Sequence, residues 1–298
     1  MAKITEVYPS FFMKLPLMLL SFLFFTSCVK EITMPDYGLM TQPSMNAVVK
    51  GGELITVYLF ENGTTGGGEL NAVNNALVEV WNDGIMIDSV SNADEGEYET
   101  EVEAEFGKDY EIRATIDGKT MSSSFRVPSP PVLIEATHIP FGGVDDEGAI
   151  YPGVEVVLER SRLNDAYYEV VIWLDTYDNL RPAEFYFLRD PFIVREGLPL
   201  ALFSDEGVSE ESFSVFITYT TNSHSGDAIK TYPFFVELRS VTEDYYHYRR
   251  SFYLNMNSQE ELEPGLENSP ADLFSNVKGG SGRVVSYSSV VSELLNVD

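Results

Sequence analysis

The sequence predicts a mainly β protein of two successive domains behind an N-terminal targeting segment. Three observations support this class: short runs in which apolar and polar residues alternate, turn residues between those runs, and one helical pattern near the C-terminal end. The chain has 298 residues, of which 44% are hydrophobic and 13% aromatic. This composition argues against a wholly disordered chain, and the length suits about two domains of ordinary size.

Residues 1–27 have the pattern of a signal peptide. Lys3 and Lys14 precede an apolar run over residues 15–25, which is too short to span a bilayer but suits the core of a cleaved signal. The run leads into Thr26-Ser27-Cys28, and the chain has one cysteine. The pattern resembles a bacterial lipobox, in which Cys28 becomes the lipidated first residue. The alternative is an ordinary secretory signal with an incidental cysteine.

Residues 28–44 are expected to form a lipidated tether. Pro35, Gly38 and Pro43 interrupt a stretch with little periodicity, which is typical of a linker. Lys30-Glu31, just after the cysteine, resembles the surface-export signal of Bacteroidetes lipoproteins. Acyl chains on Cys28 would hold the protein at a membrane.

Residues 45–131 show the patterns of a small β-sandwich. From Tyr110 to Ile116 apolar and polar residues alternate, which places the apolar ones on one face of a strand. Asn82-Asp83-Gly84 predicts a hairpin turn between two further strands. Six or seven short strands are expected here, which indicates an immunoglobulin-like or transthyretin-like sandwich. Prolines 128, 130 and 131 mark its boundary.

Residues 132–298 predict a second, antiparallel β domain that carries one amphipathic helix. The run Tyr168–Leu174 is almost wholly apolar, which predicts a central strand buried on both faces. A capping box is expected at Ser240 and Glu243, with a helix near 241–257. The apolar stripe of this helix is Val241, Tyr245, Tyr248, Phe252 and Met256.

Composition and motifs also argue against several classes of function. The formal net charge is −28, which disfavours binding to nucleic-acid phosphates. A single cysteine allows no intrachain disulfide and no zinc cluster of cysteines. Ser281 lies in a glycine-rich segment without the G-x-S-x-G elbow of a nucleophile, and the histidines fit no H-E-x-x-H pattern. We therefore expect no catalytic site and no cofactor.

Asp145, Asp146 and Glu147 form a weak candidate for calcium binding. Clustered carboxylate oxygens are the ligands that calcium prefers. The segment lacks the alternating acids and distal glutamate of an EF-hand loop. A solvated turn is the favoured interpretation.

The order of these features resembles the Bacteroidetes outer-membrane lipoproteins grouped as domain of unknown function 4249. The resemblance rests on the lipobox, the N-terminal sandwich, the run Leu202–Gly207, the tyrosine-rich stretch 240–248 and the segment Ser275–Gly282. Arg283-Val284 departs from the pattern, because the family tends to continue with an aromatic residue. The resemblance implies a lipoprotein at the outer membrane of a Gram-negative bacterium, exposed on the cell surface and associated with a TonB-dependent transporter. It implies no catalytic residues.

Two hypotheses of function follow. The first is a noncatalytic binding or accessory protein beside a TonB-dependent transporter, with a small-molecule or glycan ligand left open. The second is a surface enzyme, such as a glycosidase that uses two carboxylates on loops of the second domain. Convergent carboxylates in an aromatic cleft would favour the enzyme, whereas an apolar surface patch would favour a protein partner.

Overall fold

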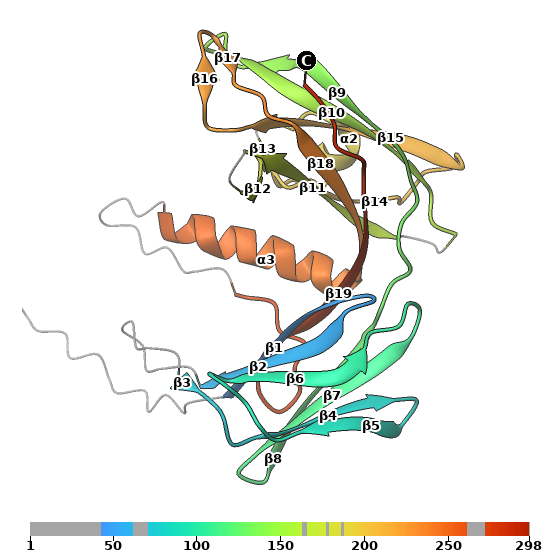
Figure 1. Cartoon of the computed structure of the whole chain (residues 1–298), viewed down its shortest axis with the longest axis vertical. Coiled ribbons are helices and arrows are strands. Elements are labelled where there is room, and N and C mark those ends of the chain that lie inside the picture. Colours follow the sequence, from blue (N-terminus) through green and yellow to red (C-terminus); the bar gives the residue numbers. More distant parts are fainter. Residues whose placement is uncertain are drawn as a thin grey trace, which may run out of the picture. The chain divides into compact units, whose positions relative to one another are not determined.

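The computed structural model describes residues 43–61, 71–162, 166–176, 179–185, 188–260 and 272–297. Strands account for 56% of the structure and helices for 8%, which confirms the predicted mainly β class. Across the described ranges the strands form three sheets (Figure 1). None of the helices described is both long and apolar enough to cross a membrane.

The largest sheet has the strand order β12-β11-β18-β19-β1-β2-β3, with β14 beside β11 and β6 beside β2. Its strands are β1 (Pro43–Lys50), β2 (Leu54–Glu61), β3 (Asn71–Ala72), β6 (Glu97–Glu103), β11 (Tyr167–Asp175), β12 (Leu180–Pro182), β14 (Leu202–Ser204), β18 (Phe234–Val241) and β19 (Ser281–Val291).

The second sheet has the order β13-β15-β10-β17-β16, with β9 beside β10. Its strands are β9 (Leu133–Val144), β10 (Ile150–Glu159), β13 (Glu184–Phe185), β15 (Ser212–Thr220), β16 (His224–Ser225) and β17 (Ala228–Ile229). The third sheet, in the order β5-β4-β7-β8, consists of β4 (Leu77–Asn82), β5 (Ile85–Val90), β7 (Asp109–Ile116) and β8 (Lys119–Arg126). The helices are α2 (Pro191–Val194) and α3 (Glu243–Glu260).

The N-terminal strands form a sandwich around one apolar core. Ile55 and Val57 of β2 lie in the same cluster as Val80 of β4 and Ile112 of β7, so the large and the third sheet face each other. Alternation along β7 buries Tyr110, Ile112, Ala114 and Ile116, as the sequence predicts. Asp83 and Gly84 join β4 to β5 with positive φ angles of 49° and 76°, which suits a tight hairpin turn.

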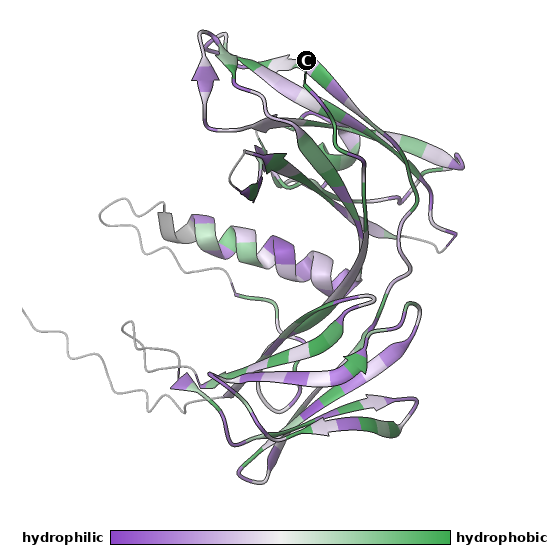
Figure 2. Cartoon of the chain, in the orientation of Figure 1, coloured by the Kyte–Doolittle hydropathy of each residue, from purple (hydrophilic) through white to green (hydrophobic). Residues whose placement is uncertain are grey.

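A second core lies between the second sheet and the far end of the large sheet. Val154 and Val156 of β10 share it with Val170 and Ile172 of β11 and with residues of β15 and β18. Figure 2 shows the hydrophobic first half of β18, where Phe234 and Val236 are fully buried. The apolar run predicted as a central strand is therefore β11, which pairs with β18, β12 and β14.

Strand β19 connects strands from both parts of the sequence. It pairs in parallel with β1 over seven residue pairs, from Ser44–Ser281 to Lys50–Tyr287, and antiparallel with β18. The predicted domain boundary near residue 131 falls between β8 and β9. Strand β19 follows this boundary in the sequence, yet it pairs with β1, which precedes it. Its residue Val284 lies in the N-terminal core.

Two serines of β19 hold the proline-rich segment between β8 and β9. Ser286 Oγ donates a hydrogen bond to the carbonyl of Arg126 at 2.6 Å, and Ser288 Oγ donates to that of Pro128 at 2.6 Å. Both serines are 0% exposed. The hydroxyls thus satisfy two carbonyls at the end of β8 and in the proline segment, where prolines cannot continue a strand ladder.

The helix begins later than the sequence predicts. Ser240 and Val241 belong to β18, where they pair with Ser288 and Tyr287 of β19, so the expected capping box at Ser240 is wrong. Thr242 caps α3 instead, since its Oγ1 accepts a hydrogen bond from the backbone N–H of Tyr245 at 3.3 Å. Sheet pairing has overridden the local capping signal.

Candidate functional site

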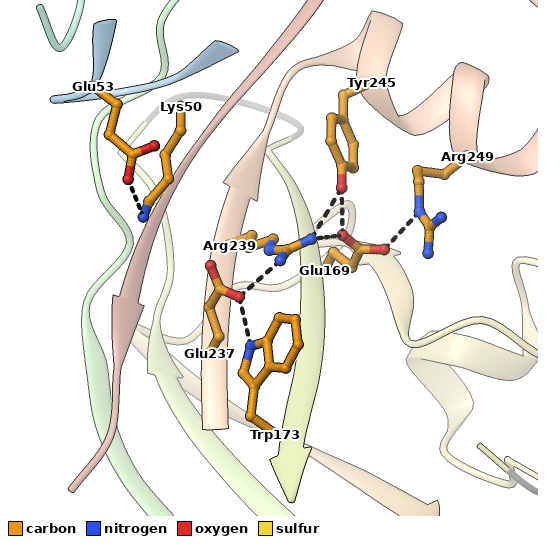
Figure 3. A network of polar contacts seen from close by, with 8 residues as sticks. All are labelled: Lys50, Glu53, Glu169, Trp173, Glu237, Arg239, Tyr245 and Arg249. Atoms are coloured by element: carbon orange, nitrogen blue, oxygen red, sulfur yellow. Dashed lines mark hydrogen bonds and ion pairs between the residues drawn. The ribbon is translucent and has the colours of Figure 1, made fainter. Parts of the chain in front are cut away.

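A buried charged network joins α3 to strands β11 and β18 (Figure 3). Glu169 of β11 is 4% exposed. Its Oε2 accepts hydrogen bonds from Arg239 Nη1 at 3.0 Å and from Tyr245 Oη at 2.6 Å. Its Oε1 accepts one from Arg249 Nε at 2.8 Å. Arg249 therefore reaches inward to the sheet from the helix.

Glu237 forms the second half of this network. Its Oε2 accepts hydrogen bonds from Arg239 Nη2 at 2.7 Å and from Trp173 Nε1 at 2.8 Å. The Arg239 guanidinium also lies over the ring of Tyr287, 4.7 Å from its centre. Burial opposes ionisation of Glu237, but the hydrogen bonds and charge of Arg239 outweigh it and lower the pKa of the carboxyl.

Strand register places these groups together. Glu169 and Arg239 are directly paired residues of β11 and β18. Glu237 and Arg239 are two residues apart on β18, so they share a face, opposite to the core residues Val236 and Leu238. The same alternation puts Trp173 on the face of Glu169. The arrangement binds both carboxyl groups to Arg239 and ties α3 to Glu169, which suits fixing the helix in place.

A separate set of contacts ties α3 to the turn after α2. Tyr246 Oη donates a hydrogen bond to Glu196 Oε2, and Arg250 Nη1 donates to the Glu196 carbonyl at 2.6 Å. Burial and the neighbouring Glu196 carboxylate raise the pKa of Tyr246 to about 12. The tyrosine therefore stays protonated and keeps donating at neutral pH.

Asp205 is a buried carboxylate that binds the backbone at Ser161, just after β10, and at Ala166, just before β11. It is 1% exposed and accepts hydrogen bonds from the backbone N–H of Ala166 at 2.8 Å and of Ser161 at 3.3 Å. Tyr168 Oη donates to it at 3.2 Å. Burial and the Asp205 charge raise the pKa of Tyr168, while Arg160 acts in the opposite direction. Arg160 is thus a positive charge beside this pair.

A cavity of about 720 Å³ opens next to Asp205 and its loop. Its walls come from the proline segment after β8, the end of β10, the start of β11 and the junction of β18 with α3. Three arginines line it, namely Arg126, Arg160 and Arg162, together with two glutamates, Glu159 and Glu243. The volume is in the range typical of small-molecule sites.

A long edge strand carries the most exposed aromatic side chain among the described residues. β9 pairs only with β10 in this part of the chain. Three residues of β9, Pro140 to Gly142, lie opposite the single Pro152 of β10, which makes a β-bulge. Phe141 in this bulge is 76% exposed. A Cβ at Gly142 would come 2.6 Å from the backbone nitrogen of Gly153, so the bulge requires glycine there.

The residues singled out from the sequence lie apart. Cys28 is outside the described residues. Asp145 stabilises its own turn, because its Oδ1 accepts hydrogen bonds from the N–H groups of Glu147 at 2.9 Å and Ala149 at 2.8 Å. Asp146 and Glu147 are exposed. Within the described ranges no three His, Cys, Asp or Glu side chains are grouped so that they could hold a metal ion.

Sequence reasoning missed the buried network and the arginine-lined cavity. Glu169 interrupts an otherwise apolar strand, and the motif Glu237-x-Arg239 places opposite charges on one face of another. Charges at such positions are a signal of buried pairing, since they are rarely buried alone. The partners, however, follow only from the register of β11 against β18.

A family model described as a domain of unknown function (DUF4249) matches residues 41–293. A search among curated proteins found no match. The matched range contains both apolar cores, the buried network, the cavity and the edge strand.

Proposed function

The chain belongs to the DUF4249 family, and from that premise we propose that it is a lipid-anchored, noncatalytic accessory protein that docks on a TonB-dependent outer-membrane transporter. The observation that carries the docking role is the exposed Phe141 on the bulge of edge strand β9. The proposal has two parts, an anchor and a contact surface, and each has its own support.

The anchor is supported by the first 28 residues. A short apolar run ends at the single cysteine, and the first described strand begins at Pro43. Anchoring at Cys28 would confine the protein and an outer-membrane transporter to one plane. Confinement raises the effective concentration of both, so a weak interface would be occupied.

The contact surface is supported by the chemistry of β9. In 12 residues the strand has one formally charged side chain, Glu135, whereas 22% of the whole chain is charged. Ile134 and Val144 are about half exposed, in addition to Phe141. Natural proteins usually protect edge strands with charges, and an uncharged apolar edge marks a surface for protein contact.

The buried carboxylates do not favour the enzyme hypothesis. Glu169 and Glu237 are both bound by Arg239, and α3 also binds Glu169 through Tyr245 and Arg249. A glycosidase needs one carboxyl with a raised pKa to protonate the leaving group. The pKa of Glu237 is instead lowered.

The test is crosslinking in intact cells followed by purification of the full-length protein in mild detergent. We expect a TonB-dependent transporter among the crosslinked partners and its loss in Phe141→Ser, because the exposed ring can be removed without opening the core. Ile85→Ser is the matched control, since Ile85 is 66% exposed on a different edge strand, β5.

Anchoring has a separate test. Cys28→Ser should move the protein from the membrane fraction to the soluble fraction, which fractionation and labelling with a fatty-acid analogue would measure. Retention of a processed, unlabelled Cys28→Ser protein in the membrane would contradict the anchor. Recovery of the crosslinked wild type without any transporter would contradict docking, and turnover of a glycan by the purified protein would favour the enzyme hypothesis.

A further inference from the structure

We propose that the arginine-lined cavity beside Asp205 binds a small organic anion through a carboxylate, sulfate or phosphate group. This inference goes beyond the docking role, since it concerns a different surface and a different class of ligand. It rests on the arginines that line the cavity, on their hydrogen-bond donors that lack an acceptor, and on the contacts that hold the backbone beside Arg160.

Arginines outnumber acidic residues among the described residues that line the cavity. The chain has 19 basic and 47 acidic residues, yet in the described part of the lining there are three arginines and two glutamates. One of the glutamates, Glu243, lies 3.6 Å from His247 Nε2, and Glu159 is exposed at the end of β10. Arginines gathered in one cavity of so acidic a chain are a feature of anion recognition.

Two of the arginines have spare hydrogen-bonding capacity. Arg126 is paired with Asp109 at 2.8 Å. Arg160 and Arg162 have no ion pair within the described part of the chain, and the Nε–H of Arg160 is buried there without an acceptor. A guanidinium offers five donors in a planar fork that matches a carboxylate or phosphate. A bound oxyanion would supply the acceptors that these donors lack.

The backbone beside Arg160 is held in place before any ligand arrives. Asp205 accepts hydrogen bonds from the N–H groups of Ser161 and Ala166. Ser161 directly follows Arg160, and Ala166 directly precedes β11. Tyr168 packs against Phe203 at 5.6 Å between ring centres and donates to the same carboxylate. Preorganised donors lose less conformational entropy on binding, so they favour a specific ligand over loose ion attraction.

The experiment is calorimetric titration of the full-length protein in nonionic detergent at physiological salt. The probes are glucuronate, citrate and inorganic phosphate, with glucose as the neutral counterpart of glucuronate. We expect at least one of the anions to bind and glucose not to bind. Arg162→Gln should weaken binding by about tenfold, which corresponds to the loss of one charge-assisted contact.

The controls separate the cavity from general charge effects. Lys119→Gln removes one positive charge in the β7–β8 hairpin, away from the cavity, and should leave affinity unchanged. Arg160→Gln should also weaken binding, and its thermal unfolding shows whether the fold is retained. Binding that is unchanged in Arg162→Gln, binding of glucose equal to that of glucuronate, or no binding of any anion at millimolar concentration would each overturn the proposal. The transporter crosslink is scored independently, so either result can fail alone.

Discussion

The N-terminal sandwich and the region under α3 bury very different side chains. All four of the buried carboxylates among the described residues, Glu169, Asp190, Asp205 and Glu237, lie after residue 131. The buried polar groups of the sandwich strands are hydroxyls, such as Thr100 and Ser123. The sandwich is therefore specified by alternation of apolar and polar residues, whereas the second region, the part under α3, depends on the ion pairs of Arg239 with Glu169 and Glu237. Such pairs contribute specificity and become costly when one partner is lost.

The largest effect is expected where the second region loses its central cation. Arg239→Met leaves Glu169 and Glu237 buried without their shared partner and should reduce the free energy of unfolding by about 4 kcal/mol. Chemical denaturation would measure it. Arg113→Met in the sandwich is the matched control, because Arg113 also binds a carboxylate and lies over an aromatic ring but is partly exposed. An equal loss of stability in both variants would contradict this difference between the two regions.

The second largest loss of stability is expected at the aromatic contact between α3 and β19. Tyr248 is 9% exposed and lies under the guanidinium of Arg283, 4.2 Å from its ring centre. Tyr248→Ala should cost about 3 kcal/mol through lost burial and a cavity. Phe252→Ala, whose ring is 37% exposed on the same helix, should lower the melting temperature much less. Similar melting temperatures for Tyr248→Ala and the parent would refute the packing of α3.

The buried hydroxyl of Tyr98 tests how much a polar contact contributes to the stability of the sandwich. Tyr98 is 0% exposed, donates to the Val73 carbonyl at 2.8 Å and accepts from the Ala76 N–H at 3.0 Å. Tyr98→Phe should cost about 2 kcal/mol, because both backbone groups stay buried without that partner. Urea denaturation would measure the change. A neutral substitution would mean that water replaces the hydroxyl.

Acid should weaken the second region through Glu237. Its pKa is lowered in the folded protein, so its contribution to stability is complete above the unfolded value, near pH 4.3 for a glutamate, and is lost as the pH falls through the lowered value. Denaturation between about pH 6 and pH 3 should show a smaller loss of stability in Glu237→Gln than in the parent. Parallel pH profiles for the two proteins would contradict this assignment.

The smallest effect is expected for a surface pair in the first region. Lys50 Nζ lies 2.6 Å from Glu53 Oε1, and the hydrogen bond to this carboxylate raises the pKa of Lys50. The side chains are 35% and 59% exposed. Glu53→Gln should change the free energy of unfolding by about 0.5 kcal/mol and less at high salt. A change as large as that of Arg239→Met would show that exposure does not control these pairs.

The sequence predicted the sandwich strands well because their evidence is local. The alternation in Tyr110–Ile116 and the turn at Asp83-Gly84 both act over a few residues, and both are confirmed. The helix start was wrong because Ser240 and Val241 satisfy their backbone groups in the sheet. A capping motif in the sequence does not show that a strand competes with the helix for the same residues.

The candidate sites were less predictable for a physical reason. The Glu169–Arg239 contact joins residues that meet only through the register of two strands, and Arg160 meets the proline segment only in three dimensions. Strand β19 likewise has no local signal that it pairs with β1, because its partner lies at the other end of the described chain. Spacing along the sequence carries no information about such neighbours.

The parallel pairing of β1 with β19 has a consequence for the order of synthesis. Arg283 Nη1 donates to Asn46 Oδ1 across a sequence separation of 237 residues, and Val284 fills part of the N-terminal core. Contacts of such long range form slowly, since the chain between them must first be ordered. The β1 edge that β19 covers therefore stays unpaired until residues 281–287 have been synthesised. A chain cut short before residue 281 would lack β19 and would leave that edge of β1 exposed to proteases and to other strands.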